Sequence, residues 1–181
     1  VLAMKKVLVL TGDGINCEKE SAAAAKAVGF SVEIKHINDL LREELEGVRW
    51  LDEVSLIVIP GGFSFGDELG SGKILALKLK HGLGESLLKW VDDGGLVLGI
   101  CNGFQVLTQL GIFGKEVALV HNSHGRFLNR WIGLKISGRS VFTDPLIKSG
   151  KDYLELPMRH GEGRLVFANN ELAEKTFEQG Q

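Results

Sequence analysis

An apolar run at residues 96–100 leads directly into the segment Gly99-Ile100-Cys101-Asn102-Gly103, and a helical pattern begins at Asn102. A strand, a Gly-x-Cys-x-Gly turn and a helix in this order are the layout of a nucleophile elbow. The glycines leave room for a strained backbone and for the close approach of a substrate. The amino end of the helix favours negative charge that develops beside it. The segment therefore predicts an α/β fold in which Cys101 is the nucleophile of covalent acyl transfer.

Strand and helix patterns alternate up to Gly111. Continuous apolar runs at 7–10 and 56–59 are typical of strands that are buried in a parallel sheet, and residues 31–36 alternate as a third strand does. Helical spacing separates the strands, at residues 18–28, 40–45, 73–81, 85–92 and 102–110. We therefore predict an open, mostly parallel sheet with helices on both faces.

After Gly111 the segments become shorter and mixed. Residues 133–137 and 164–168 indicate antiparallel strands between loops. Because no repeat, linker or low-complexity tract interrupts the chain, we expect residues 1–181 to form a single domain.

Composition and charge exclude several classes of partner. The chain has 181 residues, of which 44% are hydrophobic and 24% are charged, as in ordinary globular domains. The net charge of -2 gives no reason to expect nucleic acid as a partner. No apolar run is long enough to span a bilayer, so no membrane partner is expected either. Two cysteines are too few for a disulfide framework and favour a cytoplasmic location.

Three turns follow predicted strands, at residues 11–18, at residues 60–67 and at Cys101. Active sites of open α/β sheets lie outside the carboxyl ends of the strands, so we expect these turns to converge. Gly61 and Gly62 can present backbone N–H groups to an oxyanion, and the N–H of Asn102 supplies another donor. Such donors stabilise the tetrahedral intermediate that acyl transfer requires.

Several motifs together resemble one family. They are Gly14-Ile15-Asn16-Cys17-Glu18, Pro60-Gly61-Gly62-Phe63-Ser64-Phe65-Gly66-Asp67, Gly99-Ile100-Cys101-Asn102-Gly103-Phe104-Gln105 and His160-Gly161-Glu162-Gly163. In content and order they resemble the class I (triad) glutamine amidotransferases, and among these the glutaminase subunit or domain of phosphoribosylformylglycinamidine synthase. That enzyme belongs to purine biosynthesis. The resemblance covers nearly the whole chain and implies a flavodoxin-like sheet.

The resemblance implies that glutamine is hydrolysed and that its ammonia passes to a synthetase partner. It makes Cys101 the nucleophile and gives the oxyanion hole to Gly62 and Asn102. It assigns contacts with glutamine to the remaining candidates, Gly61, Phe63 and Gln105. The chain carries no phosphate-binding Gly-x-x-x-x-Gly-Lys-[Ser/Thr] loop, so no cofactor is expected in it, and ATP and magnesium are expected in the synthetase partner.

One departure concerns the family's catalytic His and Glu, which lie in a C-terminal His-Pro-Glu segment. This chain contains no His-Pro-Glu. His160 and Glu162 have the same spacing, but they match a separate upstream motif of the family and are expected to be structural or to face the partner. We therefore expect the sequence to lack the family's C-terminal end and the chain alone to be nearly inactive.

Two other classes of function remain open. A DJ-1/PfpI-like cysteine hydrolase has a similar frame, although Asn102 follows the nucleophile here where a His is usual. A non-catalytic binding subunit keeps the fold without the base. Cys17 is expected to be structural, and no metal site is expected, because His121 and His124 have no third ligand at suitable spacing.

Overall fold

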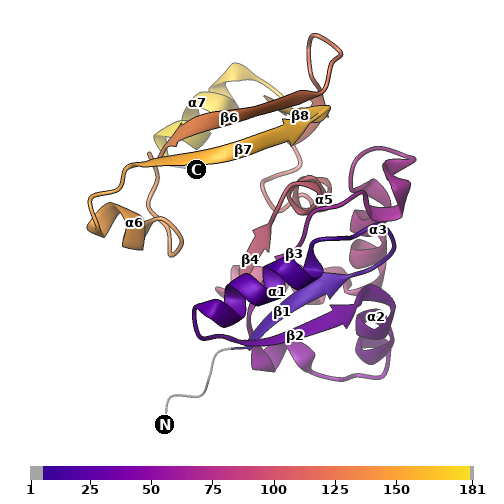
Figure 1. Ribbon diagram of the computed structural model, residues 1–181. Helices are drawn as coiled ribbons and strands as arrows, with labels where there is room; N and C mark the ends of the chain where they lie inside the picture. Colours follow the sequence, from indigo (N-terminus) through magenta and orange to yellow (C-terminus); the bar gives the residue numbers. More distant parts are fainter. Residues whose placement is uncertain (1–5, 180–181) are drawn as a thin grey trace. The chain divides into compact units, whose positions relative to one another are not determined.

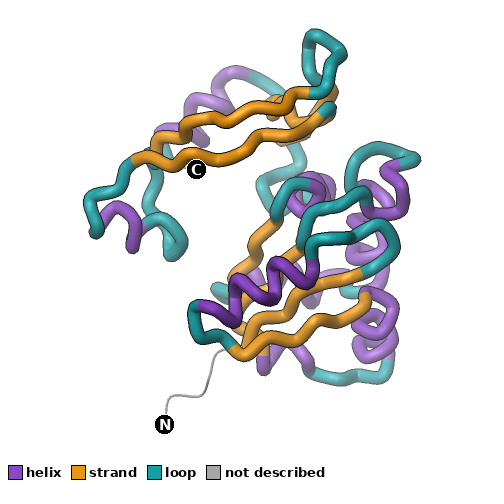
Figure 2. The backbone as a smooth tube through the Cα atoms, viewed as in Figure 1, coloured by secondary structure: helices purple, strands orange, loops and turns teal. Residues whose placement is uncertain are grey.

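The computed structural model describes residues 6–179, so the end of the chain at Gln181 lies outside the described part. The described residues form two compact units that divide between Lys115 and Glu116. Figures 1 and 2 show each unit with its own strands and helices. Each unit is described by itself below, and the single domain over residues 1–181 stays a prediction.

The first unit is built on a four-stranded parallel sheet in the order β2-β1-β3-β4 (Figure 1). Its strands are β1 (Lys6–Thr11), β2 (Ser31–His36), β3 (Val54–Ile59) and β4 (Leu96–Gly99). The two central strands, β1 and β3, carry the continuous apolar runs, because side chains on both of their faces are covered. The edge strand β2 alternates apolar and polar residues in its sequence, but burial does not follow this alternation, since Ile34 is 42% exposed while Glu33 and Lys35 are half-buried.

Helices cover both faces of this sheet, which confirms the predicted fold class. The helical segments are α1 (Glu18–Ala27), α2 (Ile37–Leu45), η1 (Trp50–Glu53), η2 (Ser64–Asp67), α3 (Lys73–Gly82), α4 (Gly84–Asp92) and α5 (Asn102–Leu110). Val7 and Val9 pack with Ala22 of α1 on one face. Leu8 and Leu10 lie in the larger core, to which α2, α3, α4 and α5 contribute. The alternation along β1 therefore divides its side chains between two helical layers.

The second unit contains two small antiparallel sheets, coloured from salmon to yellow in Figure 1. One pairs β5 (Val117–His121) with β8 (Glu162–Phe167), and the other pairs β6 (Leu128–Lys135) with β7 (Tyr153–His160). The helices are α6 (Asp144–Lys148) and α7 (Asn170–Glu178). Antiparallel strands were predicted here, but the expected strand at 133–137 was wrong in its bounds, since β6 begins at Leu128 and ends at Lys135.

The helix expected at 40–45 begins earlier, at Ile37. His36 caps it, because the Asn38 N–H donates a hydrogen bond to His36 Nδ1 at 3.1 Å. A capping side chain satisfies an N–H group that has no partner within the helix. Within residues 6–179, no helix has the length and apolarity that crossing a membrane requires.

Candidate active site

Cys101 lies between the last residue of β4 and the first residue of α5, at φ 53° and ψ −109°. A positive φ is uncommon for a residue other than glycine and is strained. The Phe104 N–H donates to the Cys101 carbonyl oxygen at 3.0 Å, so the residue caps α5 with its own backbone. Its side chain is exposed. The strand–turn–helix position predicted for Cys101 is therefore confirmed, and its role as nucleophile stays a prediction.

Two glycines let α5 approach the sheet. A Cβ atom at Gly103 would lie 1.9 Å from the Ile59 carbonyl oxygen, and one at Gly99 would lie 2.7 Å from the Gly103 carbonyl carbon. Both distances are far below van der Waals contact. The two glycines of the Gly-x-Cys-x-Gly pattern, Gly99 and Gly103, are thus required by the close packing of the elbow helix against the ends of β3 and β4.

The turn after β3 is bonded to the turn after β1. The Phe63 N–H donates to the Gly14 carbonyl oxygen at 2.8 Å, and the Asn16 N–H donates to that of Gly61 at 3.3 Å. These bonds flank an antiparallel bridge between Ile15 and Gly62. Because these bonds join the residues on either side of the bridge, Ile15 and Gly62 do not hydrogen-bond each other. The Gly62 N–H therefore points away from the turn after β1. This orientation suits the predicted oxyanion donor.

Gly61 lies where the three turns meet. A Cβ atom at Gly61 would lie 3.4 Å from the Cys101 Cβ and 3.9 Å from the Cys17 Sγ. The turns at residues 11–18, at residues 60–67 and at Cys101 therefore all contribute atoms to one place, at the carboxyl ends of β1, β3 and β4. The predicted convergence of the turns is confirmed within the first unit.

The side chain of Asn102 joins the second turn to the elbow. It is 1% exposed, and its Oδ1 accepts a hydrogen bond from the Ser64 N–H at 3.1 Å. Its Nδ2 donates to Asp67 Oδ1 at 3.0 Å and to Gln105 Oε1 at 3.0 Å. The sequence predicted a role for the Asn102 backbone only, and it missed Ser64 and Asp67 as members of the site.

Two predicted glutamine contacts differ in exposure. Phe63 is 65% exposed, with its ring outside the core. Gln105 is half-buried, and its side-chain oxygen accepts from Asn102. Both lie in the first unit with Cys101, and their contact with glutamine stays a prediction.

Cys17 is the second thiol near the elbow. It is half-buried at the start of α1, and its Sγ–H donates to Asn16 Oδ1 at 3.2 Å. Burial raises the pKa of Cys17 above its ordinary value, and electrostatic interactions with the nearby Glu20, Cys101 and Glu18 raise that pKa further. Cys17 therefore remains a neutral thiol at neutral pH and is a poor nucleophile.

His160 and Glu162 belong to the second unit. His160 ends β7 opposite Leu128, and its carbonyl oxygen accepts from Asn122 Nδ2 at 2.9 Å. A Cβ atom at Gly163 would lie 2.4 Å from the His160 Cγ, so the imidazole occupies the space above that glycine. Within the described residues the buried His160 Nδ1 has no hydrogen-bond partner. Glu162 begins β8 opposite His121. A structural or interface role for the pair stays a prediction.

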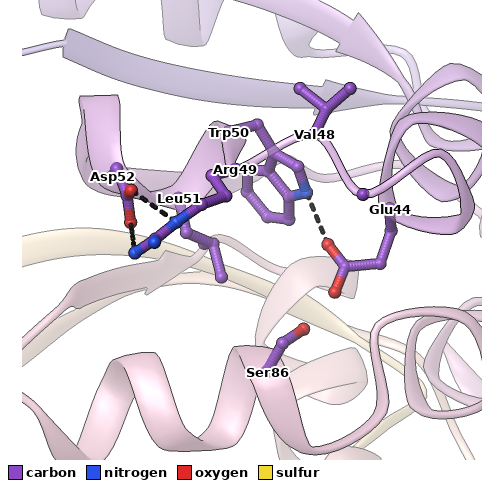
Figure 3. Close-up of a pocket in the computed structure, with 8 residues that line it drawn as sticks. Glu44, Val48, Arg49, Trp50, Leu51, Asp52 and Ser86 are labelled. Carbon is purple, nitrogen blue, oxygen red and sulfur yellow. Dashed lines mark hydrogen bonds and ion pairs between the residues drawn. The ribbon is translucent and has the colours of Figure 1, made fainter.

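A hollow of about 230 Å³ lies at the other end of the first unit, beside the residues that precede β3 (Figure 3). The indole Nε1 of Trp50 donates to Glu44 Oε2 at 2.9 Å, and Arg49 pairs with Asp52 at 2.8 Å. These side chains satisfy one another and project no reactive group. Over residues 6–179 no group of three or more His, Cys, Asp or Glu side chains is placed to hold a metal ion.

Comparisons with known proteins agree with this geometry. A family model described as the CobB/CobQ-like glutamine amidotransferase domain matches residues 4–181. The chain belongs to this family of glutamine amidotransferases. Its fold therefore has the class that the elbow and the motifs around it predicted, and the family favours glutamine amidotransfer over the DJ-1/PfpI-like alternative.

Individual relatives are more specific. The chain is 40% identical over 173 residues to the phosphoribosylformylglycinamidine synthase subunit PurQ of Methanococcus maripaludis, a match that covers 91% of this chain and 60% of the relative. It is 36% identical over 180 residues to the subunit of the same name from Picrophilus torridus, covering 98% of this chain and 68% of the relative. The chain thus spans about 60% of the length of the first of these relatives.

Solved structures show the same fold. The structure of PurLQS from Thermotoga maritima matches with a TM-score of 0.71 and 28% identity, covering 93% of this chain and 72% of that one. A glutamine amidotransferase from Thermotoga maritima matches with a TM-score of 0.54 and 18% identity, covering 92% of this chain and 64% of that one. At 18% identity the second match supports the fold alone.

Proposed function

We propose that this chain is the glutaminase component of a phosphoribosylformylglycinamidine synthase. The observation that carries the proposal is the exposed Cys101 thiol on a strained turn, beside a glycine turn whose Gly62 N–H points away from its own bridge. Membership of the glutamine amidotransferase family supports glutamine as the acyl donor, and the relatedness to PurQ subunits supports the synthase. Cys101 is the catalytic nucleophile in this proposal, and the N–H groups of Gly62 and Asn102 form the oxyanion hole.

The reaction has two steps. The Cys101 sulfur attacks the carboxamide carbon of glutamine, a C–S bond forms, and the C–N bond breaks as the thiol proton leaves with the nitrogen in ammonia. Water then attacks the thioester, which releases glutamate and restores the thiol. Negative charge develops on the carbonyl oxygen in both steps, and each oxyanion donor contributes about 3–4 kcal/mol of transition-state stabilisation. Gly61, Phe63 and Gln105 contact the glutamine.

The ammonia is consumed by a synthetase partner, which holds the ATP and magnesium that formation of the amidine requires. The chain itself needs no cofactor for hydrolysis of an amide by a thiol. We place the protein in the cytoplasm, because both cysteines are free thiols and unpaired cysteines are typical of proteins from a reducing compartment.

A diazo-ketone analogue of glutamine tests the proposal. The reagent alkylates a nucleophile that binds the glutamine side chain, so peptide mapping is expected to find it on Cys101. Glutamine in excess is expected to prevent the labelling, and glutamate is expected to protect less. Cys101→Ser should abolish the modification, while Cys17→Ser should leave it in place. Labelling that glutamine does not slow would contradict glutamine as the acyl donor and would instead indicate another cysteine hydrolase.

A further inference from the structure

The loop after the second turn has an unusual backbone. Phe65, Gly66 and Asp67 follow one another at φ 54°, 70° and 53°. Two of these three left-handed residues have side chains, so the loop is strained, and strained backbone persists only where neighbouring contacts impose it. The contacts that impose it here start from the carboxylate of Asp67.

Asp67 Oδ1 accepts two hydrogen bonds. One comes from the Gly72 N–H at 2.9 Å, at the residue that precedes α3, and the other comes from Asn102 Nδ2 at 3.0 Å. The first bond closes the strained loop on itself. The second ties the loop to the first residue of the elbow helix α5.

The second bond also decides which way the Asn102 amide faces. A carboxylate can only accept, so the Asn102 NH₂ group faces Asp67 and the Asn102 Oδ1 faces the Ser64 N–H. Without Asp67 the Asn102 NH₂ group keeps Gln105 Oε1 as an acceptor but loses the partner that can only accept, so the orientation of the amide is less strongly fixed. The reversed amide would place a donor against the Ser64 N–H, and the backbone of the second turn would lose its attachment to the elbow.

We propose that Asp67 is a positioning residue of the Cys101 site. It acts through the Asn102 side chain, which holds the backbone of Ser64 in place. Because Gly62 lies two residues before Ser64, this bond also keeps the Gly62 N–H aimed at the same oxyanion as the Asn102 N–H. Asp67 does not touch the substrate. The proposal rests on the proposed function, since it concerns the two donors of the oxyanion hole. Glutamine binding through other side chains does not depend on it.

The test compares two electrophiles on the 181-residue chain. The diazo-ketone analogue of glutamine places a carbonyl oxygen at the two N–H donors of the oxyanion hole. Iodoacetamide alkylates the exposed Cys101 thiol by displacement of iodide and does not need these donors. Asp67→Ala is expected to slow labelling of Cys101 by the diazo-ketone about 10- to 100-fold, the loss that a displaced oxyanion donor produces. The iodoacetamide rate should stay close to wild type, as should the glutamine concentration that gives half protection.

Two further variants supply the controls. Asp67→Asn keeps an oxygen that accepts both hydrogen bonds, so its diazo-ketone rate should return to near wild type. Asp52→Ala removes a carboxylate that pairs with Arg49 just before β3, at the opposite end of the strands from Cys101. The rates of labelling by the diazo-ketone and by iodoacetamide should both stay unchanged. If Asp67→Ala does not fold, Asp67→Glu replaces it, since it moves the carboxylate by one methylene and should slow the diazo-ketone selectively.

Three results would overturn the proposal. A wild-type diazo-ketone rate in Asp67→Ala shows that the donors do not need Asp67. An equal fall in the rates of Cys101 labelling by the diazo-ketone and by iodoacetamide shows that Asp67 has only a structural role. A wild-type chain whose labelling glutamine does not slow overturns the proposed function and the positioning role with it. The first of these results, together with glutamine protection in the wild type, overturns the positioning role and leaves the proposed function standing.

Discussion

Ser64 and Asn102 are 38 positions apart in the sequence, and the Ser64 N–H donates to Asn102 Oδ1 at 3.1 Å in the interior of the first unit. Both residues are 1% exposed. Their parent strands, β3 and β4, are neighbours in the sheet. The bond therefore connects the turns at the ends of two adjacent strands through a side chain, at a place where water cannot substitute for either partner.

Asn102→Asp is expected to lower the free energy of unfolding by about 3–5 kcal/mol, the cost of an uncompensated buried charge. The new carboxylate cannot donate to Asp67 or Gln105, and it stands against the carboxylate of Asp67. Denaturant unfolding followed by circular dichroism measures the change. The loss should become smaller as the pH falls, because protonation removes the buried charge.

Asn129→Asp is the matched control for this change. Asn129 is exposed in β6, and its Oδ1 accepts from Arg159 Nε at 3.0 Å, so a carboxylate there gains an opposite charge. Its unfolding midpoint should stay close to wild type. Equal destabilisation by the two substitutions would contradict a special role for the buried amide.

The sequence predicted the parts of the site that depend on local pattern. Gly99, Cys101 and Gly103 identify the elbow within five consecutive positions, and Gly61-Gly62 directly follows a buried strand. The side-chain bonds of Asn102 could not be predicted in the same way, because Ser64 and Asp67 are distant in sequence and their partner is set by the strand order. The only local signal was a polar residue, Asp67, at the end of a glycine-containing turn.

The errors in the second unit have other causes, which lie in the local sequence. β7 was missed because Pro157 lies in its middle, opposite Trp131, and a proline argues against a strand. In a two-stranded sheet each strand has a free edge, so the missing N–H costs little. The helix α7 was missed although Asn169 caps it, with the Leu172 N–H donating to its Oδ1 at 2.8 Å. That capping pattern is readable in the sequence.

Gly163→Ala is expected to destabilise the second unit by about 1–3 kcal/mol, the usual cost of overpacking. The new methyl group would lie 2.4 Å from the His160 Cγ, which is attached close to the backbone and cannot swing away cheaply. Gly161→Ala is the control, because its nearest neighbour would be Phe127 Cδ2 at 3.8 Å. Thermal unfolding should separate the two variants. Identical transitions would show that the imidazole can leave its place above Gly163 at no cost.

Glu33→Gln is expected to make stability less dependent on acid pH. The Glu33 carboxylate on β2 lies 2.6 Å from Lys6 Nζ and 3.2 Å from Lys35 Nζ. The hydrogen bond from Lys6 lowers the pKa of Glu33, while burial opposes the change. Because the folded pKa lies below the ordinary value of 4.5, the stabilisation is present above pH 4.5 and is lost as the pH falls through the lowered pKa.

The substitution should therefore lower the free energy of unfolding at pH 7 by up to about 1 kcal/mol, since the pair is partly exposed to solvent. The difference from wild type should vanish in acid. Glu53→Gln serves as the control, because Glu53 is 72% exposed and its pair with Lys6 is longer, at 3.3 Å. Urea titrations at several pH values measure both. An effect of Glu33→Gln that grows on acidification would contradict the direction of the pKa change.

The two cysteines should differ in reactivity toward iodoacetamide. At pH 7 alkylation is expected on the exposed Cys101 first, and Cys17 should react only as the pH approaches or exceeds 9.0, because burial raises its pKa above that ordinary value. Glu20→Gln removes a negative charge that also raises the Cys17 pKa, so it should speed modification of Cys17 in alkaline solution. Glu85→Gln, in the distant helix α4, should not. Peptide mass spectrometry over time resolves the two sites, and equal rates at pH 7 would show that the Cys17 thiol is neither shielded nor held neutral.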